Sequence, residues 1–316
     1  MPDFEIVQSD AAEALRGMDA GSVHCCVTSP PYWGLRDYGE ADQLGLEPTP
    51  DLYVERMVEV FAEVRRVLRD DGTLWLNLGD SYATGAGAVG DCPGGGSQGD
   101  NWKGATTSPN RMPIPGLKPK DLVGIPWRAA FALQADGWYL RSDIIWAKPN
   151  PMPESVRDRP TKAHEYIFLL SKSKRYFYDA DAIAENGNPS NYRGNPTTRR
   201  CPPGKQPQGK MDARRGEIDA TTRNKRTVWT VTTKPYAEAH FATFPPKLIE
   251  PCVLAGCPEG GTVLDPFCGS GTTGVVALRA SRDFLGIELN PEYVTMARHR
   301  IQDDGALLNN EVAATP

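Results

Sequence analysis

The sequence predicts an α/β fold in which helices pack on a central β-sheet. Short apolar segments rich in β-forming residues alternate with helical patterns along most of the 316 residues, as in layered α/β domains. Near the carboxyl end, the segment TVLDPFCGSGTT has the pattern of a strand, a glycine-containing turn and the start of a helix. A hydrophobic content of 40% and a charged content of 24% are ordinary for a globular protein.

The first predicted elements are a strand, a long helix and a second strand. Residues 23–28 form an apolar run that predicts a buried strand. Thr49 and Pro50 are typical of a helix start, and apolar residues recur after them at helical spacing until Asp71, where we expect the helix to end. The segment GTLWLNLGD, residues 72–80, predicts the next strand.

The middle of the chain begins with an unusual composition. Residues 83–111 are dominated by Gly, Ser, Asn and Pro, which predicts a mobile loop rather than a packed element. After it we expect a helix over 124–136 and strands over 140–148 and 164–172.

The carboxyl-terminal part returns to regular alternation of helices and strands. We expect a helix over 245–256, a strand over 262–267, a helix over 272–280, a strand over 284–289 and a last helix from Pro291.

Composition argues against several classes of protein. No apolar run approaches the roughly 18 residues that a membrane helix needs, and the segment MPDFEIVQSD lacks a secretory signal pattern. We therefore expect a cytoplasmic protein with no membrane partner. Seven cysteines form no CxxC pair and no cluster with histidine, which favours reduced, mostly buried thiols and no bound metal.

Positive charge is concentrated in one segment, although the formal net charge of the chain is −5. Residues 186–235 contain eleven basic and three acidic residues among many Gly, Pro, Asn and Gln residues. Such a block is typical of a surface that contacts phosphates, and a solvated, partly disordered insertion is the alternative interpretation.

A rigid polar corner follows the first predicted strand. In the segment VTSPPY, two consecutive prolines restrict the backbone directly after Ser29. The serine hydroxyl is a hydrogen-bond acceptor and Tyr32 offers an aromatic face, so the corner is a candidate site. A turn that merely ends the strand is the alternative.

The glycine-containing turn near the carboxyl end is a candidate ligand site. Gly269 and Gly271 allow close approach of the backbone to a ligand, and the helix that follows presents free N–H groups. Glu288 ends the next predicted strand, where open α/β sheets bind ribose hydroxyls. A tight connection followed by an exposed acid is the alternative.

Both segments resemble motifs of one family. DPFCGSGTT closely resembles the S-adenosylmethionine motif of the amino-methylating DNA methyltransferases, and VTSPPY resembles their catalytic motif. The catalytic motif comes first, the basic segment second and the cofactor motif last, which resembles the beta group of this family. The resemblance implies a Rossmann-like, circularly permuted sheet dependent on S-adenosylmethionine, with amino-terminal catalytic strands beside carboxyl-terminal cofactor strands.

The resemblance also implies a division of the chain. Residues 1–182 would form the catalytic half of one methyltransferase domain, with 83–111 as its mobile loop. Residues 183–235 would form a basic target-recognition region inserted into that domain, and 236–316 would form its cofactor-binding half.

A set of residues is assigned to the cofactor by the same resemblance. Glu288 would hold the ribose hydroxyls and Asp10 would approach the adenine, although Asp10 could equally cap the helix AAEAL. The full set is Asp10, Phe244, Pro245, Asp265, Pro266, Phe267, Cys268, Gly269, Gly271, Thr272, Glu288 and Asn290.

The catalytic corner would act on the exocyclic amine of a base that is flipped out of the duplex. Ser29 and the carbonyl of Pro30 would accept hydrogen bonds from the amine, Pro31 would keep the corner rigid, and Tyr32 would stack on the base. No covalent intermediate is needed for this chemistry.

Serine at the first motif position accompanies cytosine N4 methylation more often in this family, so we expect cytosine N4, with adenine N6 as the alternative. Trp33 and Tyr38 either enclose the base or pack internally. Cys25 and Cys26 lie in an apolar strand, which favours structural thiols over the nucleophile that ring-carbon methylation would need.

The resemblance implies double-stranded DNA as the partner. A cognate restriction endonuclease is a possible second partner. The sequence is compatible with a monomer and with a homodimer. RNA or protein amide methylation and a non-enzymatic DNA-binding relic are disfavoured by the serine, the motif order, the basic segment and the intact motifs. Arginines and lysines of the basic segment would contact phosphates and base edges. These residues are Arg193, Arg199, Arg200, Lys205, Arg214, Arg215, Arg223, Lys225 and Arg226.

Overall fold

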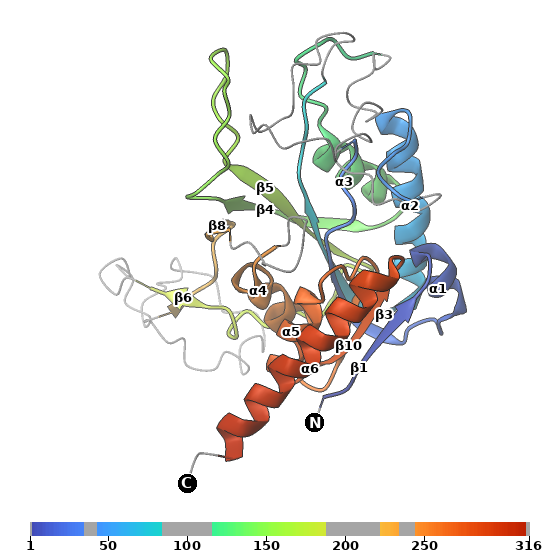
Figure 1. The fold of residues 1–316 in the computed structure, drawn as a ribbon, viewed down its shortest axis with the longest axis vertical. Helices are drawn as coiled ribbons and strands as arrows, with labels where there is room; N and C mark the ends of the chain where they lie inside the picture. The colour runs from blue at the N-terminus through green and yellow to red at the C-terminus, as the bar shows by residue number, and fades with distance from the viewer. Residues whose placement is uncertain (1, 35–42, 84–115, 188–221, 234–243, 314–316) are drawn as a thin grey trace, which may run out of the picture. The chain divides into compact units, whose positions relative to one another are not determined.

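The structure is a computed structural model (Figure 1). Its internal contacts divide the chain into two compact units. One unit contains Met1–Asp179 and Thr227–Pro316, and the other contains Ala180–Arg226. The residues described are 2–34, 43–83, 116–187, 222–233 and 244–313, with side chains described up to residue 305. The predicted loop over 83–111 and most of the predicted recognition region therefore lie outside the described residues, and the division into 1–182, 183–235 and 236–316 stays a prediction.

The larger unit is built on an eight-stranded sheet in the order β1-β10-β9-β2-β3-β5-β4-β8. The first five strands of this order are parallel, β5 is antiparallel to both of its neighbours, and β8 is parallel to β4. The strands are β1 (Phe4–Gln8), β2 (Val23–Thr28), β3 (Leu68–Leu78), β4 (Tyr139–Ala147), β5 (His164–Ser171), β8 (Val228–Thr230), β9 (Thr262–Asp265) and β10 (Asp283–Glu288).

Six helices accompany the sheet in the described part of the chain. They are α1 (Ala11–Gly17), α2 (Pro50–Val67), α3 (Ile125–Ala135), α4 (Pro246–Gly256), α5 (Thr272–Arg279) and α6 (Pro291–Ala313). Helix α2 packs against α1 and α3, while α5 packs against α4 and α6. None of these described helices is both long and apolar enough to cross a membrane.

The two helix groups cover opposite faces of the sheet. Neighbouring residues of β3 show this, because successive side chains of a strand point to opposite faces. On β3, Leu74 and Leu76 belong to the apolar core formed with α1, α2 and α3. Trp75 points to the other face, where a methyl group added at Gly256 of α4 would lie 2.4 Å from its Nε1 atom. Both faces of the central strands are thus buried, which explains their continuous apolar sequence.

The centre of the sheet joins the two ends of the sequence. Strand β9 from the carboxyl-terminal part pairs with β2 from the amino-terminal part, in the register Cys25↔Val263 and Cys26↔Leu264. At the edge, β1 pairs in parallel with β10, so the blue and red strands of Figure 1 lie side by side. The expected permuted, Rossmann-like arrangement of catalytic and cofactor strands is confirmed.

Several boundaries differ from the sequence predictions. Helix α2 ends at Val67, not near Asp71, because β3 already begins at Leu68, which pairs with Val23. Strand β9 ends at Asp265, two residues early, since the backbone turns there and the N–H of Phe267 donates back to the Asp265 side chain.

Two further elements were not predicted as such. Strand β1 had no prediction, and β8 lies inside the segment predicted as the recognition region although it pairs with β4 at the edge of the sheet. In the smaller unit, β6 (Glu185–Asn186) and β7 (Thr222–Arg223) form an antiparallel pair.

Candidate active site

Polar residues gather at one edge of the sheet, where the parallel strands have their carboxyl ends. The antiparallel strand β5 starts at this same edge, and β4 ends there. This topology brings together residues that are far apart in the sequence, as expected for the ligand-binding edge of an open α/β sheet. They are Asp10 after β1, Ser29 after β2, Asp80 after β3, Lys148 after β4, Glu165 in β5, Asp265 in β9 and Glu288 in β10.

The Ser-Pro-Pro-Tyr corner directly follows β2 and is fixed by contacts with the apolar core. The hydroxyl of Tyr53 in α2 donates to the carbonyl of Pro31 over 2.9 Å. Trp33 is 1% exposed, and its Nε1 donates to the carbonyl of Glu47 over 2.8 Å. Trp33 therefore packs beneath the corner, while Tyr38 lies outside the described residues.

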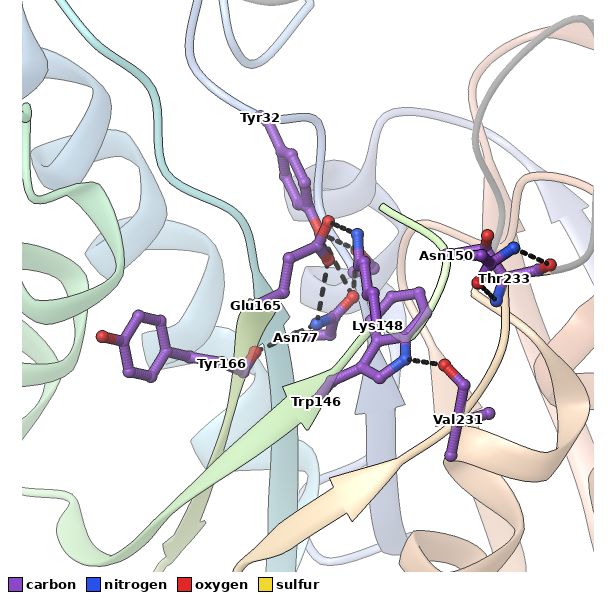
Figure 2. Close-up of polar contacts among 10 residues, drawn as sticks. Tyr32, Asn77, Trp146, Lys148, Asn150, Glu165, Tyr166, Val231 and Thr233 are labelled. Carbon is purple, nitrogen blue, oxygen red and sulfur yellow. Dashed lines mark hydrogen bonds and ion pairs between the residues drawn. The ribbon is translucent and has the colours of Figure 1, made fainter. Parts of the chain in front are cut away.

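A polar cluster joins this corner to strands β3, β4 and β5 (Figure 2). The hydroxyl of Tyr32 lies 2.8 Å from Glu165 Oε2 and 3.1 Å from Asn77 Oδ1. The hydroxyl of Ser29 lies 3.3 Å from the same Asn77 Oδ1. Lys148 forms an ion pair with the other carboxylate oxygen of Glu165. We refer to these five residues as the corner cluster.

Tyr32 is held as a neutral hydrogen-bond donor within the corner cluster. Burial raises the pKa of its phenol well above the ordinary value, and the neighbouring Glu165 carboxylate raises that pKa further. The phenol proton is therefore retained at neutral pH, and it is available for donation to Glu165 or Asn77.

The ring of Tyr32 lies closely over the backbone at the end of β3. A methyl group added at Gly79 would lie 2.5 Å from Tyr32 Cε2, so only glycine leaves room for the ring in this position. A small hollow beside it is lined by Tyr32, Trp33, Gly79, Asp80, Ser81 and Ile125. Tyr32 thus borders a concave surface, as its proposed contact with a base would require.

Asp80 connects the site to helix α3. Its Oδ1 accepts hydrogen bonds from the backbone N–H groups of Gly124 and Ile125 over 2.9 and 3.1 Å. The carboxylate takes the place of a local cap, because Gly124 is the N-cap residue and has no side chain to fill that role. The helix start is in this way fixed to the end of β3.

Lys162 places a buried ammonium group near the corner cluster. Its Nζ atom is shielded from solvent and has no hydrogen-bond partner in the structure. Burial lowers its pKa, while the nearby carboxylates of Asp80 and Glu165 act in the opposite direction. Burying a cation without a hydrogen-bond partner costs free energy of folding, so the presence of Lys162 here suggests that it has a role in the site.

Five of these residues had no prediction from the sequence: Asn77, Asp80, Lys148, Lys162 and Glu165. Each is a polar residue in or just beyond an apolar strand segment, as in LNLGD, WAK and KAHEY. A polar residue at the end of an apolar strand segment was the only feature of the sequence that pointed to these five site residues. It becomes specific only once the antiparallel pairing of β5 with both β3 and β4 is known.

The turn predicted to bind the cofactor, residues 266–271, follows β9 and is called the cofactor turn below; Asp265 holds it through hydrogen bonds. Both of its oxygens accept hydrogen bonds inside the protein, from the hydroxyls of Thr28 and Thr273, each over 2.6 Å. Oδ1 also accepts from the N–H of Phe267 over 3.1 Å. The carboxylate is 1% exposed, and burial raises its pKa to about 6 despite these bonds.

Glu288 at the end of β10 is bound to the same turn. Its Oε2 accepts from the N–H of Gly269 over 2.8 Å, and its Oε1 accepts from the N–H of Asn290 over 2.9 Å. Burial raises its pKa, while these two backbone donors lower it. A carboxylate offers about four acceptor positions, so room is left for a further donor such as a ribose hydroxyl.

The backbone of the turn depends on its glycines. Gly269 and Gly271 have φ angles of 52° and 76°, a left-handed conformation that glycine adopts without a steric penalty. Arg300 of α6 donates to Ser270 Oγ over 2.8 Å and to Thr272 Oγ1 over 2.9 Å, which fixes the start of α5. The turn is therefore preformed.

The other predicted cofactor residues lie near this edge in different roles. Asp10 caps helix α1 by accepting from the N–H of Glu13 over 3.0 Å, which is the alternative considered for it. Pro245 is the N-cap residue of α4, and Phe244 precedes it. Pro266 and Cys268 are buried, while Phe267 is partly buried.

Only three of the predicted DNA contacts lie in the described residues. Arg223 and Arg226 both pair with Glu185, at 3.3 and 2.9 Å, within the smaller unit. Lys225 is partly exposed, and the other predicted contacts lie outside the described residues.

The cysteines near the site are structural. Cys25 and Cys26 are fully buried in β2, and burial raises the pKa of both thiols well above the ordinary value. Such thiols are not nucleophilic at neutral pH.

Comparisons with known proteins identify the family of the chain. The family model N6_N4_Mtase, described as DNA methylase, matches residues 23–299. The Type II methyltransferase M.SmaI of Serratia marcescens is 52% identical over 298 residues, which cover 94% of this chain and 90% of that protein.

Solved structures share the fold. The PvuII DNA methyltransferase, described as cytosine-N4-specific, is similar with a TM-score of 0.62 and 18% identity, covering 96% of this chain and 91% of that one. The putative DNA modification methylase TTHA0409 of Thermus thermophilus, in complex with S-adenosyl-L-methionine, is similar with a TM-score of 0.58 and 21% identity, covering 96% of this chain and 95% of that one.

Proposed function

The chain belongs to the N6/N4 DNA methylase family and is an S-adenosylmethionine-dependent DNA methyltransferase, and on this premise we propose that it methylates N4 of cytosine in double-stranded DNA. The observation that carries the choice of base is Ser29, a serine at the first position of the corner. The cytosine-N4-specific description of the PvuII methyltransferase, which shares the fold, is consistent with this choice.

The exocyclic amine of cytosine is a poor nucleophile because its lone pair is delocalised into the ring. Two acceptors at fixed positions favour the pyramidal nitrogen that can attack a methyl group. Ser29 Oγ and the Pro30 carbonyl would supply these acceptors, and the two prolines limit their movement. Tyr32 would hold the flipped base by stacking.

Most of the residues that we assign to the cofactor lie at the end of β9 or β10 or follow these strands, and β9 is next to the strand β2 that leads into the corner. Glu288 would bind the ribose hydroxyls, and the turn at Gly269 and Gly271 would approach the cofactor with its backbone. S-adenosylmethionine supplies the activated methyl group. Thr28 connects the cofactor residues to the corner, because it precedes Ser29 and donates to Asp265.

Recognition of DNA would fall to the basic segment around 186–235, whose excess of Arg and Lys favours phosphate contacts. We also propose that a cognate restriction endonuclease accompanies the enzyme, since M.SmaI is named a Type II methyltransferase.

Product analysis tests the choice of base. The protein is incubated with duplex DNA and S-adenosylmethionine carrying a labelled methyl group, and the DNA is digested to nucleosides. We expect label in N4-methylcytosine, and RNA and protein substrates serve as controls. Label only in N6-methyladenine would assign the other amine of this family and overturn the cytosine proposal.

A further inference from the structure

The orientation of the Asn77 side-chain amide is determined by its surroundings. Its Nδ2 lies 3.0 Å from the backbone carbonyl of Tyr166, which can only accept a hydrogen bond, and 3.5 Å from Glu165 Oε2. Turning the amide over would place two acceptors against each other. Asn77 Oδ1 therefore faces the hydroxyls of Ser29 and Tyr32, as Figure 2 shows for Tyr32.

Tyr32 has one proton and two acceptors within reach. Glu165 Oε2 is the closer one at 2.8 Å, against 3.1 Å for Asn77 Oδ1. Glu165 is also the ion-pair partner of Lys148, and a charged acceptor makes a stronger hydrogen bond than an amide oxygen does. The Tyr32 proton thus goes to Glu165, and Asn77 Oδ1 stays available to Ser29.

Ser29 has the last free proton of this chain of hydrogen bonds. Its hydroxyl can donate to Asn77 Oδ1 at 3.3 Å, or at 3.4 Å to the oxygen of Tyr32. In both cases the proton points back into the protein. The two lone pairs of Ser29 Oγ remain for hydrogen bonds that come from outside the cluster.

We propose that Asn77 is a positioning residue that fixes the polarity of the Ser29 hydroxyl, so that Ser29 presents an acceptor to the amine of the target base. This inference rests on the proposed function and deepens it. Without Asn77 Oδ1, only the longer contact of 3.4 Å to the Tyr32 oxygen is left to hold the serine proton inside the protein, and the proton can turn toward the substrate more easily. Ser29 would then offer a donor where the amine, which is itself a donor, needs an acceptor, and the fixed polarity required for catalysis is lost.

The same arrangement makes serine the fitting residue at position 29. An aspartate there would place carboxylate oxygens against Asn77 Oδ1, with no proton between them. The amide could relieve this repulsion only by turning over and losing its bond to Tyr166. Asn77 is in this way a specificity-determining partner of Ser29.

A double-mutant cycle tests the proposal with the full-length protein. Asn77→Leu keeps a similar shape and removes the acceptor, and Ser29→Ala removes the hydroxyl. For each single variant we expect kcat for methyl transfer to duplex DNA to fall at least about tenfold, with the Kd for S-adenosylmethionine within about twofold of the original. The double variant should be no slower than Ser29→Ala alone, because Asn77 acts through Ser29.

Thr73→Val is the matched control, because Thr73 is a buried polar residue on the same strand and donates to the carbonyl of Gly256, away from the site. It should leave kcat unchanged. Asn77→Ala serves as the second substitution if the leucine prevents folding, as judged by thermal denaturation. The proposal is overturned if the two losses multiply in the double variant, or if both Asn77 variants keep full kcat.

The product of the unmodified enzyme keeps this test separate from the choice of base. If that product were N6-methyladenine, the cytosine proposal would fail, while the cycle would still report whether Asn77 acts through Ser29. If the product were N4-methylcytosine and the losses multiplied, only the role of Asn77 would fail.

Discussion

The hydroxyl of Thr28 donates to Asp265 Oδ1 over 2.6 Å, across the adjacent strands β2 and β9. Thr28 directly precedes Ser29, and the same Asp265 oxygen accepts from the N–H of Phe267 in the cofactor turn. One buried carboxylate therefore joins the proposed catalytic corner to the proposed cofactor turn. Asp265 thus links the two segments to which the proposed function assigns the methyl acceptor and the methyl donor.

Asp265→Asn should change the pH dependence of stability. Because burial raises the folded-state pKa of Asp265 from 3.8 to about 6, the folded protein keeps a proton that the unfolded chain releases between about pH 4 and 6. Stability thus falls as pH rises through this window, by about 3 kcal/mol for a shift of about two units. The asparagine variant lacks this loss.

Urea denaturation between pH 4 and 8 measures this effect. The unfolding free energy of Asp265→Asn minus that of the original protein should rise with pH by about 3 kcal/mol and level off above about pH 7. A difference that is the same at every pH would show that the carboxylate does not titrate in this range. Hydrogen bonds lost to the amide contribute a constant offset and do not affect the test.

Gly79→Ala should displace the ring of Tyr32. The added methyl would lie 2.5 Å from Tyr32 Cε2, so the ring must move from its place over β3, at a cost of about 1–3 kcal/mol in stability. We expect a large loss of methyl transfer, with cofactor affinity close to normal because the turn after β9 is untouched. Transfer of labelled methyl groups and titration with S-adenosylmethionine measure the two quantities.

The control for this substitution is Gly305→Ala, where a methyl group meets no atom within 4 Å. It lies in helix α6, so alanine should stabilise the protein by roughly 0.5–1 kcal/mol and leave transfer unchanged. Normal transfer by Gly79→Ala would mean that the position of the Tyr32 ring is not important for the reaction.

Lys162→Met should stabilise the protein and impair it as an enzyme. Methionine keeps the aliphatic part of the side chain and removes the buried ammonium group, which has no hydrogen-bond partner. We expect a gain of about 1 kcal/mol at pH 7.5, at the low end for such groups because the residue as a whole is only partly buried and the carboxylates of Asp80 and Glu165 lie near its ammonium. Transfer should fall, since Asp80 and Glu165 lose a neighbouring cation.

The sign of the pH effect provides a second measurement on Lys162. Its pKa is lowered in the folded protein, so the unfolded chain binds more protons as pH approaches 10, and the stability of the original protein rises there. The advantage of Lys162→Met should therefore shrink between pH 7.5 and 10. An advantage that stays constant, or a variant less stable at both pH values, would refute the cost assigned to the ammonium.

Glu288→Gln should weaken cofactor binding. Both oxygens of Glu288 accept backbone hydrogen bonds, from Gly269 and Asn290, and a glutamine NH₂ group cannot accept in either place. We expect the Kd for S-adenosylmethionine, measured by calorimetry, to rise at least about tenfold. Glu292→Gln, an exposed position in the first turn of α6, should bind as tightly as the original protein.

Much of the fold could be predicted because local sequence determines local structure. Thr49 indeed caps α2, by accepting from the N–H of Leu52 over 3.2 Å, and Pro50 begins the helix. Strand β1 was missed because only Ile6 of its five residues is buried, so an edge strand of this kind has no apolar run. The end of α2 was misplaced because the pairing of Leu68 with Val23 is a long-range contact.

Some residues of the candidate site could likewise be predicted from local sequence, and others could not. Ser29 and the glycine turn stand in continuous motifs, so their sequence alone points to chemistry. The ion pair of Lys148 with Glu165 depends on which strands pair and on which faces their side chains lie. Asn77 is found only after both are known, because its role comes from contacts with β2 and β5 rather than from its neighbours in sequence.

The pairing of β2 with β9 also has a consequence for how the protein is made. Thr28 and Asp265 are 237 positions apart, so a ribosome completes β2, β3, β4 and β5 long before it reaches β9. During that interval the nascent chain exposes an open, apolar strand edge at β2, which invites wrong pairing and chaperone binding. We therefore expect the proposed cofactor site and catalytic corner to come together only late in translation, once β9 has paired with β2.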